Sequence, residues 1–157
     1  MANLCGIIVD IKTSEPVGDD GGFIKELLEK GSKEPFVKAS VMDLGDDYMF
    51  NCHYESEGCR ARLEGWCKWS IKDSSVKKLL TTLLSDKRVI EIRLTAEEPG
   101  CGIYADYHWI TGTMFIQSRH IEQCDMDKLK EISDEDNEVT IDDIWEVLEG
   151  KPYKGAL

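Results

Sequence analysis

Hydrophobic and polar positions alternate with a period of two through the middle of the chain, a pattern typical of strands that bury one face. The alternation predicts three successive strands at residues 36–42, 48–55 and 59–71, separated by Gly-Asp-Asp and Ser-Glu-Gly turns. In the third strand the odd positions are mostly apolar and the even positions mostly charged. We therefore expect one face of the sheet to be core and the other to be largely exposed.

The N-terminal segment has a different pattern. Residues 4–11 are almost all apolar, which suits a strand buried on both faces or a short central strand. A Gly- and Asp-rich loop follows. Apolar residues at helical spacing then predict a short helix with Asp20 as its cap and Gly31 at its end. These apolar residues are Phe23, Ile24, Leu27 and Leu28.

An amphipathic helix is expected after the third sheet strand, at residues 75–85, with Asp73, Ser74 or Ser75 as its cap. Residues 89–96 alternate as a strand, and residues 103–118 are expected to form one long strand that can bend at Gly112. These two strands form a hairpin. The side chains expected in the core are Leu63, Leu79, Leu80, Leu83, Ile90, Ile92 and Leu94.

Two helices are expected near the C-terminus. The first has a weak apolar stripe of Met126, Leu129 and Ile132. The second begins at a capping box formed by Thr140 and Asp143, and its apolar stripe contains Ile141, Ile144, Trp145 and Leu148. We expect Trp145 to anchor this helix to the rest of the domain.

The order of elements predicts an α+β fold. It consists of an antiparallel β-sheet of about five to six strands, for which a strongly curved or barrel-like form is considered, with a packed helix after the third sheet strand. Residues 1–157 are expected to form a single domain, which is an ordinary length for one core. Residues 122–150 are expected to be an acidic helical C-terminal extension of that domain.

Charge is distributed very unevenly along the chain. The segment 122–149 holds twelve acidic residues and two lysines, so it carries ten of the twelve net negative charges. Such a surface repels nucleic acid and phospholipid and attracts basic protein surfaces. We therefore expect a basic protein partner, no direct nucleic-acid binding and no membrane association.

The N-terminus contains no basic region followed by an apolar segment of signal-peptide length. This favours a cytoplasmic location. In a reducing compartment the six cysteines, Cys5, Cys52, Cys59, Cys67, Cys101 and Cys124, are expected to be free thiols.

Metal binding is the first chemical alternative, because Cys52, His53, Cys59 and Cys67 are close in sequence. However, Cys59 and Cys67 would lie about 26 Å apart on one continuous strand at about 3.3 Å per residue. The segment from Asp134 matches a calcium-binding loop poorly, because Val139 and Trp145 replace its essential Gly and Glu. We expect no metal and no cofactor.

An enzyme is the next alternative. The histidines, His53, His108 and His120, have no local signature with Cys or Ser, and there is no nucleotide-binding glycine motif. Catalytic residues can still converge from distant positions, so a small enzyme without a recognisable motif stays open. We expect no catalytic residues.

The leading hypothesis is a non-enzymatic acidic protein that inhibits or neutralises a basic nucleic-acid-binding or toxin-like protein by charge mimicry. In size and charge the chain resembles toxin-neutralising immunity proteins and phage-encoded inhibitors of defence enzymes. The expected partner-binding residues are Asp134, Glu135, Asp136, Glu138, Asp142, Asp143 and Glu146. Trp66, with Arg60 and Arg62 on the same strand face, is a secondary candidate contact.

A self-assembling structural β protein is the second hypothesis, and it leaves homo-oligomers open. Between residues 35 and 120 the order of strands and helix resembles that of phage tail-tube and secretion-tube subunits. The N-terminal strand and helix, and the acidic helices at the other end, depart from that pattern.

Overall fold

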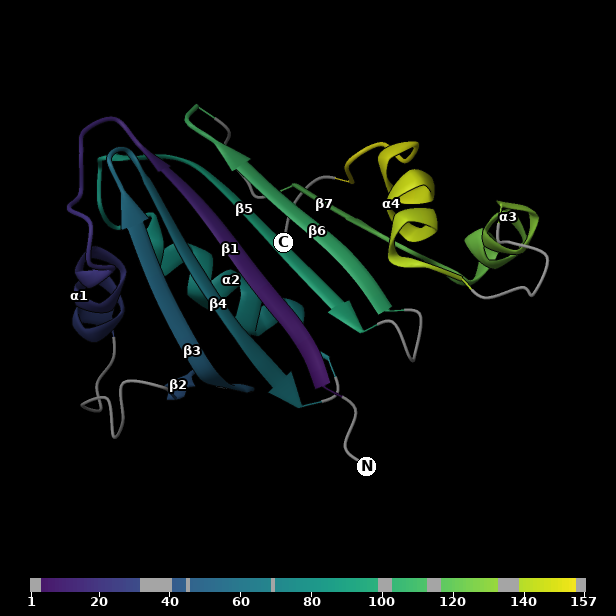
Figure 1. Ribbon diagram of the computed structural model, residues 1–157, viewed down its shortest axis with the longest axis horizontal. Coiled ribbons are helices and arrows are strands. Elements are labelled where there is room, and N and C mark those ends of the chain that lie inside the picture. The colour runs from purple at the N-terminus through teal and green to yellow at the C-terminus, as the bar shows by residue number, and fades with distance from the viewer. Residues whose placement is uncertain are drawn as a thin grey trace.

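The computed structural model describes residues 4–31, 41–44, 46–68, 70–98, 103–112, 117–132 and 139–154 (Figure 1). Its strands are β1 (Leu4–Thr13), β2 (Val41–Asp43), β3 (Tyr48–Glu57), β4 (Arg60–Lys68), β5 (Val89–Glu98), β6 (Ile103–Ile110) and β7 (Gln117–His120). Its helices are α1 (Gly22–Gly31), α2 (Asp73–Leu83), α3 (Met126–Ile132) and α4 (Ile141–Glu149), with a short 3-10 helix at Gln123–Asp125.

One antiparallel sheet organises the described residues. The strand order is β2-β3-β4-β1-β5-β6-β7, and every pair of neighbours is antiparallel. Six strands have four or more residues, and the edge strand β2 has three. The sheet is curved but not closed, because β2 and β7 lie at opposite edges. The predicted α+β class with an antiparallel sheet is confirmed.

The two faces of the sheet differ in burial, as the alternation predicted. The inner face, which we define as the face covered by α1 and α2, carries Ile7 and Val9 of β1, Leu63 of β4 and Leu94 of β5. These side chains and the apolar stripes of α1 and α2 form the main core. The outer face is the opposite one, and it carries the even-numbered, mostly polar residues of β1 and β4. Strand β1 lies at the centre of the sheet, between β4 and β5, and joins its two halves.

The two helices of the inner face begin at different signals. The backbone N–H of Gly22, at the start of α1, donates to the side chain of Asp20 at 2.9 Å, as the sequence predicted. Helix α2 begins at Asp73 after Lys72, whose side chain makes no capping hydrogen bond, so none of the three predicted caps is used. Instead, Asp73 accepts a hydrogen bond from Tyr107 at 2.8 Å.

Several predicted elements are corrected by the structure. The long strand at 103–118 is wrong, because the chain turns at Thr111 and Gly112, and β6 and β7 pair with each other. Gly112 has a φ of +91°, which only glycine adopts without strain. Residues 36–40 of the first predicted strand lie outside the described residues. The third strand covers only Arg60–Lys68.

The predicted core is confirmed except at one position. Ile90 is only half-buried, because the register between β1 and β5 shifts there and Val89 takes the inward place. Such a bulge reverses which side chain faces the core. Leu79, Leu80 and Leu83 are buried as expected, together with Leu63, Ile92 and Leu94.

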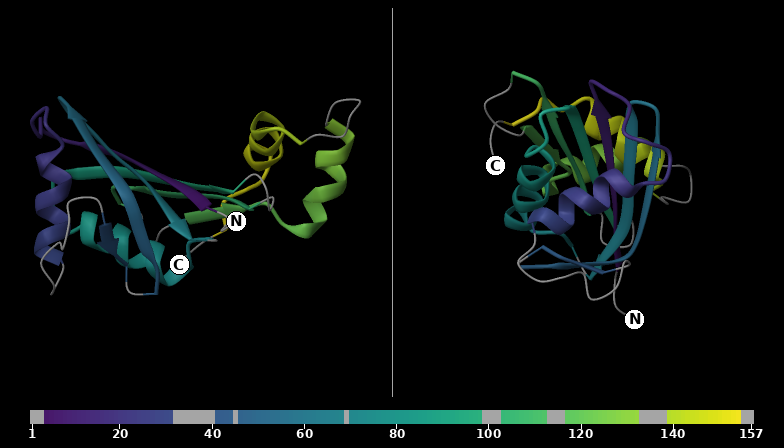
Figure 2. Two further views of the ribbon diagram at one scale, coloured as in Figure 1. Left: turned by 60° about the horizontal axis from the view of Figure 1, so that its bottom comes forward. Right: turned by 90° about the vertical axis from the view of Figure 1, so that its left-hand side faces the viewer.

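A second core lies on the outer face, where side chains of α3 and α4 pack with Tyr104 of β6. Figure 2 shows α4 on this side of the sheet and α3 beyond the end of the strands. It contains Tyr104, Leu129, Ile144, Val147 and Leu148. In Figure 2 α2 and α4 lie on opposite sides of the sheet. The capping box of Thr140 and Asp143 is confirmed, and it fixes where α4 begins.

Candidate protein-binding surface

The outer face beyond the helices carries ion pairs within and between its strands. Arg62 of β4 donates to Asp10 of β1 at 2.7 Å and lies 3.4 Å from Glu64. On β3, His53 contacts Glu55 at 3.0 Å. Oppositely charged cross-strand neighbours stabilise a sheet modestly. This part of the face therefore neutralises some of its own charge.

A cleft of about 790 Å³ opens over these ion pairs, between β1, β3, β4 and β5 and the loop that precedes α1. Its lining contains six carboxylates and four basic side chains. The predicted secondary contacts Arg60 and Arg62 line it, but Trp66 does not. Because both signs of charge line the cleft and several of these groups already pair, it favours neither cations nor anions.

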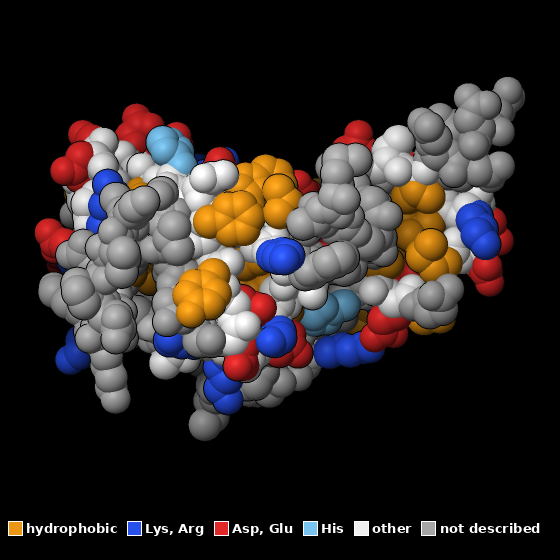
Figure 3. Space-filling view, turned by 90° about the horizontal axis from the view of Figure 1, so that it is seen from below, with side chains coloured by type: hydrophobic (Ala, Val, Ile, Leu, Met, Phe, Trp, Pro, Cys, Tyr) orange, Lys and Arg blue, Asp and Glu red, His pale blue; other side chains and the backbone are white. Residues whose placement is uncertain are grey.

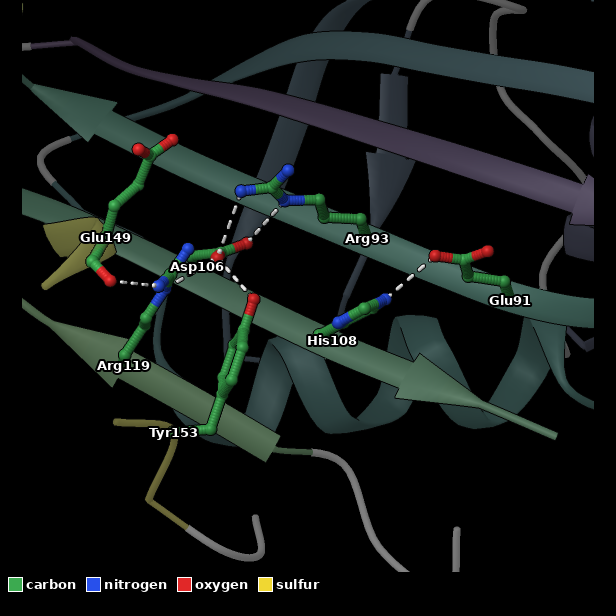
Figure 4. A network of polar contacts seen from close by, with 7 residues as sticks. All are labelled: Glu91, Arg93, Asp106, His108, Arg119, Glu149 and Tyr153. Carbon is green, nitrogen blue, oxygen red and sulfur yellow. Dashed lines mark hydrogen bonds and ion pairs between the residues drawn. The ribbon is translucent and has the colours of Figure 1, made fainter. Parts of the chain in front are cut away.

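A buried carboxylate fixes the second core to the sheet (Figure 4). Asp106 of β6 is 0% exposed and accepts hydrogen bonds from Arg93 at 3.0 Å, Arg119 at 2.9 Å and Tyr153 at 2.8 Å. Burial alone would raise the pKa of Asp106, but the hydrogen bonds from Arg93 and Tyr153 outweigh it and hold the pKa below its ordinary value. This carboxylate is a structural group.

The arginines around Asp106 also contact the C-terminal segment. Arg93 lies over the ring of Trp145 with its guanidinium carbon 5.2 Å from the centroid, and Arg119 lies 4.6 Å over Tyr153. Trp145 packs edge-on against Tyr104 with 4.6 Å between ring centroids. Trp145 therefore packs between α4 and the sheet, which is the position expected of an anchor for this helix.

Ion pairs close the C-terminal segment against the start of α3. Lys151 pairs with the buried Asp125, Lys154 pairs with Glu122, and the backbones of Ser118 and Lys154 bridge. The ion pair with Lys154 lowers the pKa of Glu122. Glu122 and Asp125, two of the twelve acidic residues in the segment 122–149, therefore stabilise the fold.

The predicted partner-binding residues divide into three groups. Asp134, Glu135, Asp136 and Glu138 lie outside the described residues. Asp143 is committed to the capping box, where its carboxylate accepts from the backbone and hydroxyl of Thr140 at 2.7 Å. Asp142 and Glu146 are exposed on α4.

Glu149 joins them on the same side of the helix, because residues four and seven positions apart lie on one helical face. We call Asp142, Glu146 and Glu149 the α4 stripe. The sequence-based list omitted Glu149, although the helical spacing was visible in the sequence.

An apolar surface lies at the end of the outer face where β1 and β3 begin. Tyr48, Trp66 and Leu4 are 62%, 44% and 42% exposed, and they are three of the five large hydrophobic side chains exposed among the described residues. Phe50, half-buried, stands opposite Trp66 on the neighbouring strand. Figure 3 views this end directly and shows hydrophobic side chains on its surface. The sequence indicated Trp66 but not Leu4 or Tyr48.

Among the described residues, the thiols and histidines do not converge. Cys5 and Cys67 face each other within the main core, whereas His53 lies on the outer face. Burial raises the pKa of Cys5 to about 11 and that of Cys67 to about 12. Cys5, Cys52, Cys59, Cys67 and Cys124 are free thiols, and Cys101 lies outside the described residues. Within the part of the chain that the structure describes, no three His, Cys, Asp or Glu side chains form a metal-binding group.

Among the described helices, none combines the length and the apolar character needed to cross a bilayer. Comparisons with protein-family models, with curated proteins and with solved structures found no match to this chain.

Proposed function

We propose that the protein binds a basic protein partner and acts on it by occupying its cationic surface, without catalysis. The observation that carries this proposal is the α4 stripe, in which Asp142, Glu146 and Glu149 point away from the domain on one helical face. None of the three makes a side-chain hydrogen bond or ion pair with another described residue. Their charges are therefore available to a partner.

Rigidity supports the same proposal. Helix α4 is held by Ile144, Val147 and Leu148 in the second core, and its first turn is fixed by the capping box. Carboxylates held on a rigid helix lose less entropy on binding than carboxylates on a flexible tail. Regularly spaced negative charges can then replace the phosphates that a basic protein otherwise contacts.

The net charge gives a kinetic reason for the same partner class. At −12 the protein attracts cationic surfaces over roughly 8–10 Å at physiological ionic strength and repels nucleic acid. Complementary charge mainly raises the association rate. A partner with a Lys- and Arg-rich channel fits this behaviour.

The test uses three baits in extracts of the cells that produce the protein. One is the unchanged protein and one carries Asp142→Lys, Glu146→Lys and Glu149→Lys. The control carries Glu15→Lys, Glu26→Lys and Glu57→Lys, which makes the same change in charge at exposed positions away from α4. We expect a basic protein to bind the unchanged and control baits and to be lost from the α4 variant.

With the captured protein purified, the association rate should fall at least about tenfold in the α4 variant at low salt. In the control variant it should change much less. If the α4 variant retains the partner as well as the control does, the α4 stripe is not the contact and the proposal fails.

A further inference from the structure

The protein contains one recurring arrangement, an arginine that pairs with a carboxylate and lies over an aromatic ring. Arg88 donates to both oxygens of Asp86 and lies 5.0 Å from the Phe23 centroid. Arg93 and Arg119 both pair with Asp106 and lie over Trp145 and Tyr153, respectively. The planar guanidinium suits this combination better than the ammonium of lysine does.

The same two components, without an arginine, meet on the apolar end of the outer face. Gly6 of β1 lies directly between Trp66 of β4 and Glu97 of β5 in the sheet register. A side chain at Gly6 would meet Trp66 Cζ3 at 3.4 Å and Glu97 Cγ at 3.6 Å. The indole and the glutamate side chain therefore converge over Gly6 from the two neighbouring strands.

Neither component has a polar partner that accounts for it. Glu97 is half-buried, and its carboxylate makes no hydrogen bond or ion pair with the other described residues, while Trp66 is 44% exposed. Lys68, the exposed cation nearest along β4, stands opposite Leu4 and does not pair with Glu97. An unpaired carboxylate beside an exposed indole favours the binding of a planar cation such as a guanidinium.

We propose that Trp66 and Glu97 bind an arginine side chain of the basic partner, with the guanidinium stacked on the indole and paired with the carboxylate. This rests in part on the proposed function, because it identifies a second contact for the same partner. Glu97 lies directly opposite Tyr104 on the neighbouring strand, and Tyr104 packs against Trp145 of α4. The site and the α4 stripe therefore border the same outer face. Nucleobases could also stack on Trp66, but their phosphates would approach a protein of net charge −12.

The experiment compares fluorescein-labelled octa-arginine and octa-lysine peptides, which have equal charge, by fluorescence anisotropy. For the unchanged protein we expect octa-arginine to bind about two- to fivefold more tightly, the range that an exposed cation–π contact provides. Trp66→Ala should reduce this ratio to about one, and Trp66→Phe should retain part of it. Glu97→Gln should weaken octa-arginine binding more than the matched single-charge control Glu57→Gln.

Ile110→Ala is the control for loss of an apolar side chain, because Ile110 is exposed on the outer face at the far end of β6. It should keep the arginine preference. A measurement on the unchanged protein separates binding from folding. In nuclear magnetic resonance spectra, the chemical shift of the Trp66 indole N–H should change when octa-arginine is added and much less when octa-lysine is added. An unchanged preference in Trp66→Ala, or equal shifts with both peptides, would overturn the proposed site.

The α4 variant distinguishes the two proposals. Reversal of the α4 stripe should weaken both peptides and leave their ratio intact. If it weakens both while Trp66→Ala has no effect, the arginine site fails and the proposed function stands. If it has no effect while Trp66→Ala removes the preference, the arginine site stands and the proposed role of α4 fails.

Discussion

The inner and outer faces of the sheet are stabilised by different chemistry. The inner face packs mainly aliphatic side chains of α1, α2 and five strands into the main core. The outer face is held by a smaller core, by aromatic contacts and by the buried Asp106 network, and these cover only the end near β6 and β7. The inner face therefore specifies the fold, while the outer face attaches the acidic helices and leaves Trp66 exposed.

Damage to the outer face should be local. Asp106→Ala leaves Arg93 and Arg119 without their shared carboxylate, and loss of one partner of a buried ion pair typically costs about 3–5 kcal/mol. Amide hydrogen exchange should accelerate in α3 and α4 and change little in β1 and α2. Equal acceleration in β1 would show that the two cores unfold together.

Damage to the inner face should be global. Leu80 is 1% exposed in the main core, so Leu80→Ala should lower the free energy of unfolding by about 2–5 kcal/mol in urea denaturation. Exchange should then accelerate in every strand. A loss below about 0.5 kcal/mol would contradict the placement of α2 against the sheet.

Trp145→Ala tests the aromatic part of the outer face. Trp145 is half-buried, so the loss should be about 1–3 kcal/mol, less than for a fully buried tryptophan. Differential scanning calorimetry should show a destabilised C-terminal unit. The opposite result, an unchanged transition with weakened partner binding, would make Trp145 a contact residue instead of an anchor.

Acid should gradually weaken the attachment of the second core to the sheet. Because the folded pKa of Asp106 is lowered, its carboxylate stabilises the fold fully above its unfolded pKa of about 3.9. This stabilisation is lost as the pH falls through the still lower folded pKa. Near-ultraviolet circular dichroism should follow the loss of aromatic packing, and Asp106→Asn should lack this part of the pH dependence. An identical acid profile in Asp106→Asn would assign the effect to other carboxylates.

The strand alternation predicted the division into a buried and an exposed face, because a period of two is a local property of the sequence. The capping box of Thr140 and Asp143 was predictable for the same reason. The sequence indicated a bend at Gly112 but not the reversal of the chain there, because the residues on both sides of it have strand character. Contacts among Arg93, Asp106 and Arg119, and the convergence of Trp66 and Glu97 over Gly6, depend on strand order and register. No local pattern contains that information.

Mapping octa-arginine onto the unchanged protein by amide chemical shifts shows whether the outer face binds cations, because it locates cation binding without any mutation. We expect shifts in α4 around Asp142, Glu146 and Glu149 and around Trp66 and Glu97, with little change in α1 and α2. Shifts concentrated on α1 and α2, or spread evenly over all acidic residues, would contradict the claim that the outer face is the binding surface.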